Sequence, residues 1–133
     1  MKILRTLASV LGSYLAVFIL VALSDPVLAH FYPAQYARGE VRPDFLLWIS
    51  TLVFMVATVL GGWLCVRLAP SRPGAHLFAL LVLGELVGLG FTWRGWSQGW
   101  PHWYSLLWLI AWPVCLWFGG LGRRSAPRTR LAT

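Results

Sequence analysis

The sequence predicts an all-α membrane protein, an antiparallel bundle of four transmembrane helices with both termini in the cytoplasm. Of the 133 residues, 59% are hydrophobic and 11% are charged, a balance that a soluble globular domain would not show. The mean hydropathy is +0.71. A helix needs about 20 apolar residues to cross a bilayer, and four stretches approach or exceed that length. Within a single membrane domain, 1–133, they are residues 6–24, 45–66, 77–93 and 103–121.

The first stretch, residues 6–24, carries small residues at helical spacing. Gly12, Ser13 and Ala16 would lie on one face of a helix and predict a packing surface. A cleavable signal peptide, cut after Ala29, is the alternative. The apolar run is longer than the usual core of a signal peptide, which favours a retained helix.

The connection before the second stretch, residues 25–44, is rich in proline and glycine. It predicts a structured turn or a short surface helix, because these residues interrupt a long one. The second stretch, residues 45–66, offers Ala57 and Gly61 as further small packing residues. The next connection, residues 67–76, holds two prolines and a glycine and predicts a tight hairpin.

The third stretch, residues 77–93, contains Gly84 and Gly88 in GxxxG spacing. This pattern predicts close packing of another helix. The expected partner is the first stretch at Gly12 and Ala16, or the second at Gly61. The alternative is a homodimer seam formed by two copies of the glycine motif.

Glu85 lies in the middle of the third stretch and is the only acidic residue within the four stretches. A charged carboxylate near mid-membrane is costly, so the neutral acid is the expected form. Tyr14, Thr58 and Trp112 lie at similar depth and can exchange hydrogen bonds with a carboxyl group. Glu85 therefore predicts either a hydrogen-bonded tie within the bundle or a proton-binding site.

Residues 93–108, which run from the end of the third stretch into the fourth, are rich in tryptophan. Their spacing of three or four residues predicts a segment lying along the membrane interface as an aromatic anchor. Binding of a lipid tail, a quinone or a pigment is the alternative. The predicted interfacial residues are Trp93, Trp96, Trp100 and Trp103.

The basic residues are unevenly divided between the two predicted sides of the membrane. Eight of the eleven lie in the N-terminal segment, the second connection and the tail 122–133. The positive-inside rule therefore places both termini in the cytoplasm. Arg123 and Arg124 begin the basic tail and predict contact with anionic lipid headgroups. Because the basic residues do not form a stripe, no nucleic-acid partner is expected.

No metal, cofactor or catalytic constellation is predicted. The polar residues near the outer surface lack the regular spacing of a metal site, and the two cysteines do not form a CxxC pair. Cleavage after Ala29 would leave an N-terminal histidine able to chelate copper, which is a separate hypothesis. Nucleophile and zinc-hydrolase motifs do not occur, so an enzyme is not expected. The outer polar residues are Asp25, His30, Glu40, Asp44 and His102.

Three short motifs resemble those of small bacterial four-helix integral membrane proteins that have no established function. They are His30-Phe31-Tyr32-Pro33, Gly61-Gly62-Trp63 followed by Arg67-Leu68-Ala69, and Pro101-His102-Trp103-Tyr104. The resemblance implies a multi-pass protein of the bacterial inner membrane and implies no activity.

These features together predict a non-enzymatic membrane component. Its expected role is to bind another membrane protein or a lipid through the glycine face and the tryptophan-rich edge. The alternative is a small dimeric transporter in which Glu85 takes up and releases a proton.

Overall fold

A computed structural model of the chain describes residues 1–37 and 42–122, and this part consists of helices joined by short turns. Glu40, Arg123 and Arg124 lie outside the described residues. Within the described part, four helices are long and apolar enough to cross a membrane, which confirms the predicted fold class at this level. The helices are α1 (Lys2–Phe31), α2 (Pro33–Ala37), α3 (Asp44–Leu68), α4 (Pro73–Ser97) and α5 (His102–Leu121).

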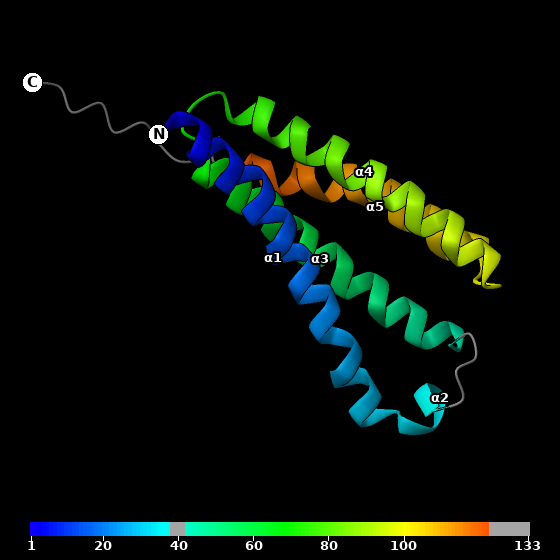
Figure 1. Ribbon diagram of the computed structural model, residues 1–133. Helices are drawn as coiled ribbons and strands as arrows, with labels where there is room; N and C mark the ends of the chain where they lie inside the picture. The colour runs from blue at the N-terminus through cyan, green and yellow to red at the C-terminus, as the bar shows by residue number, and fades with distance from the viewer. Residues whose placement is uncertain (38–41, 123–133) are drawn as a thin grey trace, which may run out of the picture.

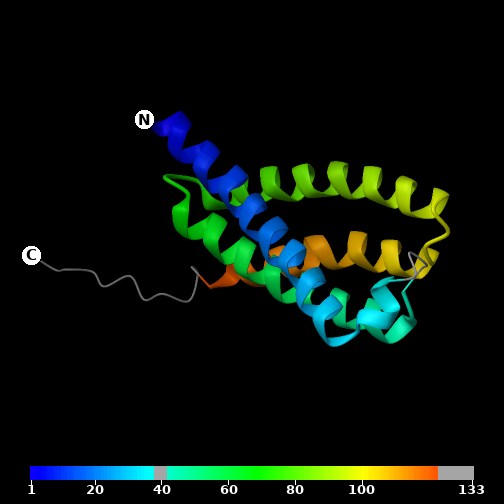
Figure 2. The same cartoon turned by 60° about the horizontal axis from the view of Figure 1, so that its bottom comes forward.

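The two central helices are α3 and α5; α1 packs on α3, and α4 packs on α5. Successive long helices run in opposite directions (Figure 1). α1 meets α4 near its own N-terminus, and the two helices then diverge (Figure 2). We call one end of the bundle the basic end, after Lys2, Arg5, Arg67 and Arg72. We call the other the aromatic end, after Trp48, Trp96, Trp100 and Trp103.

α1 is longer than predicted, because it continues through Pro26 to Phe31. A proline removes one backbone donor, yet the following turns still form, and the N–H of Tyr32 donates to the Leu28 carbonyl at 2.8 Å. Of the two alternatives expected for the following connection, a structured turn or a short surface helix, the structure contains the short helix, α2. The first connection therefore begins seven residues later than the sequence suggested.

The tryptophan-rich residues 93–108 do not form one separate segment along a surface, because they belong to the end of α4, a turn and the start of α5. α4 continues to Ser97, and a turn containing Gly99 at φ +83° reverses the chain. α5 then begins at His102. Glycine accommodates this left-handed backbone conformation, which a side chain would disfavour. The tryptophans are thus divided between the ends of two antiparallel helices.

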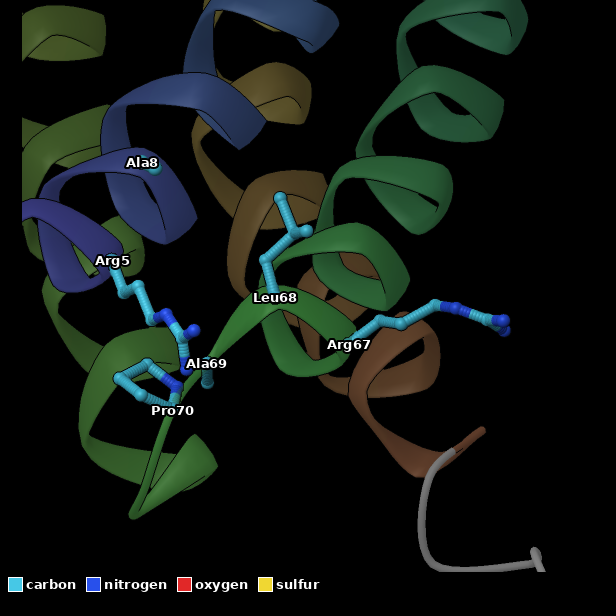
Figure 3. Close-up of a pocket in the computed structure, with 6 residues that line it drawn as sticks. All are labelled: Arg5, Ala8, Arg67, Leu68, Ala69 and Pro70. Carbon is cyan, nitrogen blue, oxygen red and sulfur yellow. The ribbon is translucent and has the colours of Figure 1, made fainter. Parts of the chain in front are cut away.

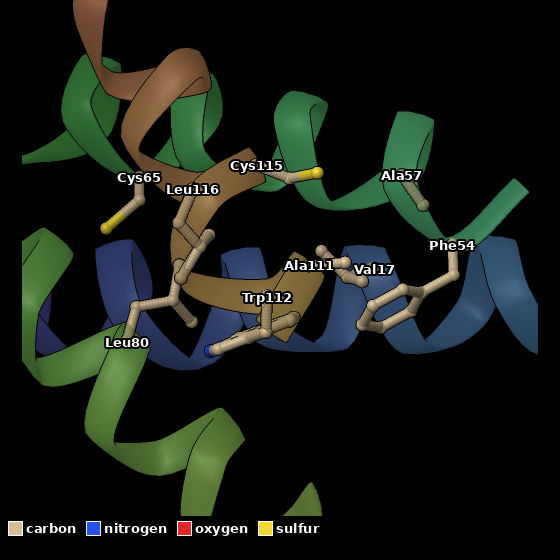
Figure 4. Packing of buried hydrophobic residues seen from close by; sticks show 9 residues of the cluster. All are labelled: Val17, Phe54, Ala57, Cys65, Leu80, Ala111, Trp112, Cys115 and Leu116. Atoms are coloured by element: carbon tan, nitrogen blue, oxygen red, sulfur yellow. The ribbon is translucent and has the colours of Figure 1, made fainter. Parts of the chain in front are cut away.

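The core lies where α3 and α5 cross at close range. A Cβ atom added to Gly62 would lie 2.6 Å from the Leu116 carbonyl oxygen, and one added to Gly119 would collide with the Val59 carbonyl oxygen. The missing side chains thus allow the two backbones to approach. Figure 4 shows the apolar cluster around this crossing. Its members are Val17, Phe54, Ala57, Cys65, Leu80, Ala111, Trp112, Cys115 and Leu116.

The glycines of α4 pack against α5, whereas the sequence suggested the first or second stretch. A Cβ on Gly84 would collide with the Trp112 indole, and one on Gly88 would lie 3.0 Å from Leu109 Cδ2. The large side chains of α5 therefore fill the space beside this glycine stripe. Both glycines thus contact α5 within the chain, and both are partly exposed.

The other predicted packing residues divide between contact and exposure. Gly61 faces Val17 of α1, so α1 and α3 approach there as small residues allow. Ala16 is partly buried. Nothing lies within 4 Å of a Cβ atom built on Gly12, and this residue takes no part in close helix packing.

Candidate functional site

Glu85 lies in the middle of α4, next to the glycine stripe, and is partly exposed. Among the described residues, no hydrogen bond or ion pair engages its carboxyl group. The apolar residues that follow it point outward: Leu86 is 65% exposed and Leu89 is 55% exposed. Glu85 is therefore a polar group on the flank of an otherwise apolar outer face.

The three expected hydrogen-bonding neighbours of Glu85 have other contacts. The Thr58 hydroxyl donates to the Phe54 carbonyl at 2.7 Å, and the Trp112 indole donates to the Leu81 carbonyl at 3.1 Å. Tyr14 packs edge-on against Trp112, with ring centroids 6.2 Å apart. The described structure thus brings Tyr14 and Trp112 together without joining them to the carboxyl group.

A column of aromatic rings runs from the middle of the bundle to the aromatic end. Its tightest contact is between Phe54 and Trp108, which stack with centroids 4.1 Å apart. The Trp108 indole also donates to the Thr51 hydroxyl at 3.0 Å. These contacts fix α5 on α3 through both packing and hydrogen bonding. In order, the column contains Tyr14, Trp112, Phe54, Trp108, Tyr104 and Trp100.

An arginine closes the aromatic end of this column. Arg42 donates two hydrogen bonds to the Asp25 carboxylate, at 2.9 and 3.3 Å. Its guanidinium carbon lies 4.5 Å from the ring centre of Tyr36 and 5.6 Å from that of Trp100. Both contacts have the geometry of cation–π interactions. Arg42 thus joins the end of α1, α2 and the turn between α4 and α5.

The phenol of Tyr36 is enclosed by this arginine cluster. Its hydroxyl oxygen is buried and has no hydrogen-bond partner among the described residues. Burial raises the pKa of Tyr36 above its ordinary value; Arg42 acts in the opposite direction, and Asp25 reinforces the rise. The phenol therefore stays neutral and packs as an aromatic surface for the guanidinium.

Sequence reasoning missed this cluster. Asp25 was placed among outer polar residues that lack the spacing of a metal site, and Arg42 was not singled out. An acid at the end of one apolar stretch and an arginine before the next were the available signals. The proline-rich connection between them hid the pairing, because its path is not readable from the sequence.

The histidines near the aromatic end contact aromatic rings. His102 lies 4.5 Å from Trp96, and His30 lies 5.6 Å from Phe31, both measured between ring centres. Across residues 1–37 and 42–122, no three His, Cys, Asp or Glu side chains are grouped as metal ligands would be. Asp44 begins α3, where an acid interacts favourably with the helix dipole.

The four tryptophans predicted to be interfacial have different surroundings. Trp93 is 78% exposed on the last turns of α4. Trp103 stacks on Trp48 with ring centres 5.1 Å apart, which links α5 to α3. Trp96 and Trp100 face the His102 and Tyr104 rings, respectively. Trp93 thus has the exposure of an interfacial anchor, while the other three also pack within the aromatic end.

Polar contacts at the basic end tie α1 to its neighbours. The Ser9 hydroxyl donates to the Cys65 carbonyl of α3 at 2.8 Å. A ring nitrogen of His76, on α4, lies 3.2 Å from the Thr6 hydroxyl. α1 is therefore joined to both helices that it meets there, in addition to its apolar packing.

Comparison with known proteins gives no relative: no family model, curated protein or solved structure matches the chain. The resemblance to small bacterial four-helix proteins therefore rests on its three motifs alone.

Proposed function

We propose that this chain is a non-enzymatic, multi-pass component of a bacterial plasma membrane that binds another membrane protein. The contact surface is the outer side of α4 around Glu85. Both termini lie in the cytoplasm, in agreement with the uneven distribution of basic residues.

The observation that carries this proposal is the carboxyl group of Glu85. It lies at mid-helix, is partly exposed and has no hydrogen bond or ion pair with the described residues. An acid at this depth costs about 2.5–3.5 kcal/mol when charged, on scales measured by membrane insertion. A partner that supplies a hydrogen-bond donor or a cationic side chain removes that cost.

The surroundings of Glu85 favour a protein partner. Phe78, Leu86 and Leu89 expose more than half of their surface on the outer side of α4. A second helix can pack on this apolar surface while it satisfies the carboxyl group. Gly84 and Gly88 are occupied by α5, so the partner contacts the large residues and not the glycine stripe.

Site-specific photo-crosslinking in the native membrane tests the proposal. A photoreactive residue at position 89, one turn beyond Glu85, is compared with one at position 18 on α1, where Phe18 is equally exposed. We expect a discrete adduct at position 89 and none at position 18. A hydrogen bond between membrane helices contributes about 1–2 kcal/mol, so Glu85→Leu should lower the adduct yield about five- to thirtyfold.

Glu85→Gln is the matched control, because the amide keeps the ability to hydrogen-bond. It should retain most of the adduct that Glu85→Leu loses. An adduct that forms equally at positions 18 and 89, or equally in the Glu85→Leu variant, would contradict the proposed surface.

The second candidate function is a dimeric proton-coupled transporter. The same absence of hydrogen-bonding partners for Glu85 among the described residues favours it, since a proton then moves without breaking an internal bond. Flux measurements in proteoliposomes test this function. The wild type should show proton-dependent flux, and Glu85→Gln should abolish that flux while the protein is expressed at the same level. An adduct at position 89 with the mass of two copies of this chain would support the transporter over the accessory protein.

A further inference from the structure

The basic end carries positive charge without acidic residues in the segments that build it. Arg5 lies on α1, Arg67 on the last turn of α3 and Arg72 before α4. The sequence contains no Asp or Glu in residues 1–24, 45–84 or 86–133. No Asp or Glu side chain of these segments therefore supplies counter-charge to this end.

A pocket of about 360 Å³ opens at this end, between the start of α1 and the end of α3. Figure 3 shows the Arg5 side chain extending from α1 over the Ala69–Pro70 segment. The pocket thus combines arginine side chains with an apolar side. Its lining residues are Arg5, Ala8, Arg67, Leu68, Ala69 and Pro70.

The two arginines of the pocket have different surroundings. Arg67 extends away from Arg5 in Figure 3, and its guanidinium carbon lies 5.0 Å from the Trp63 ring centre. Arg5 is exposed and has no carboxylate partner among the described residues. Arg5 is therefore the charged group available to a ligand in the pocket, and Arg67 contributes mainly to the surrounding potential.

The apolar side of the pocket continues along the surface of α1. Ala8 and Leu68 line its apolar side, and Leu11 and Leu15, which follow Ala8 along α1, are 46% and 55% exposed. A charged group at a helix end, followed by exposed leucines, matches a ligand with an anionic head and a hydrocarbon chain.

We propose that this pocket binds the phosphate of an anionic phospholipid. The planar guanidinium group of Arg5 donates hydrogen bonds to the phosphate oxygens. An acyl chain lies against Ala8, Leu68 and the exposed leucines of α1. The proposal is independent of the partner-protein surface around Glu85, which lies in the middle of α4.

Native mass spectrometry of the full chain in detergent tests this proposal. Phosphatidylglycerol is titrated against the wild type, Arg5→Gln, Arg67→Gln and Arg94→Gln. Arg94 lies at the opposite end of α4 and is exposed, so its variant removes an equal charge away from the pocket. We expect Arg5→Gln to weaken binding about tenfold, Arg67→Gln by less, and Arg94→Gln to leave it unchanged.

A second variant separates a built site from general attraction to positive charge. Ala8→Trp fills the apolar part of the pocket and keeps every charge. It should lower phosphatidylglycerol retention by a similar factor, while circular dichroism shows unchanged helix content. Equal retention by Ala8→Trp and the wild type would overturn the proposal, as would equal weakening by Arg5→Gln and Arg94→Gln.

The choice of ligand distinguishes a lipid from a free phosphate. Phosphatidylcholine has a neutral headgroup with the same chains, and it should bind at least tenfold more weakly than phosphatidylglycerol. Millimolar inorganic phosphate should fail to displace the lipid, because it lacks the acyl chain. Displacement by inorganic phosphate, or equal binding of the two lipids, would overturn the assignment to an anionic phospholipid.

Discussion

At the scale of single residues, the structure explains the glycines of α4 by what lies beside them. Gly84 leaves room for the Trp112 indole, which donates to the Leu81 carbonyl one turn earlier on the same helix. The ring thus lies beside the α4 backbone at Gly84 and is held there by its N–H group. A GxxxG motif therefore serves here to accept a large aromatic side chain, and not a second small-residue face.

We predict that Gly84→Ala destabilises the bundle by about 1–3 kcal/mol, the usual cost of overpacking a filled site. The added Cβ would collide with the Trp112 ring, which is held by its hydrogen bond. The unfolding midpoint in detergent, followed by tryptophan fluorescence, measures the effect. Gly12→Ala and Gly90→Ala are matched controls, because no atom lies within 4 Å of the Cβ built at either position. An equal loss in all three variants would contradict the packing argument.

At the scale of elements, Arg42 holds three segments of the chain together at the aromatic end. Asp25 belongs to the last turns of α1, Tyr36 to α2, and Trp100 to the turn between α4 and α5. The Arg42 side chain is 20% exposed and the Asp25 side chain is 48% exposed. Solvent thus screens the carboxylate more than the guanidinium, and the ring contacts carry part of the interaction.

We expect Arg42→Gln to lower the free energy of unfolding by about 1–2 kcal/mol, because it removes an ion pair and two ring contacts. Asp25→Asn should cost less, about 1 kcal/mol, since the ring contacts remain. Arg94→Gln, an exposed arginine at the same end, should change stability by under about 0.5 kcal/mol. Chemical unfolding in detergent at low salt measures all three. A larger loss for Asp25→Asn than for Arg42→Gln would contradict the role of the rings.

At the scale of the whole molecule, the charges are segregated along the helix axes. The start of α1, the end of α5 and the turn before α4 all lie at the basic end (Figure 1). Such segregation predicts that the basic end of a multi-pass protein faces the cytoplasm. The same end holds the pocket around Arg5, so the orientation and the proposed lipid site depend on the same residues.

Cysteine accessibility tests this orientation. The native Cys65 and Cys115 are buried, which leaves introduced cysteines as the reactive groups among the described residues. We expect Ser97→Cys, exposed at the aromatic end, to react with a membrane-impermeant maleimide on intact spheroplasts. Ser71→Cys, exposed at the basic end, should react only after permeabilisation. The reverse pattern would invert the orientation and place the Arg5 pocket in the outer leaflet.

The amino-acid sequence alone determined that the chain forms four long apolar helices and that charge gathers at their ends. Both features depend on each segment separately. An apolar stretch in a membrane has to satisfy its backbone hydrogen bonds within itself, as a helix does, whichever helices it packs against. For the connection that contains α2, local composition left a structured turn and a short helix as alternatives. The extension of α1 through Pro26 did not follow from it, because a single missing donor is not enough to end a helix in this setting.

The tertiary structure decided which residues face one another. The helices are apolar on nearly all sides, so periodicity does not reveal which face packs inward. Periodicity therefore did not predict that Gly84 accepts Trp112, that Asp25 pairs with Arg42, or that Glu85 has no hydrogen-bond partner among residues 1–37 and 42–122. Each of these depends on the neighbour order of the helices, with α3 and α5 at the centre. That order is set by how closely the glycine-containing backbones approach, a property of helix pairs and not of any one segment.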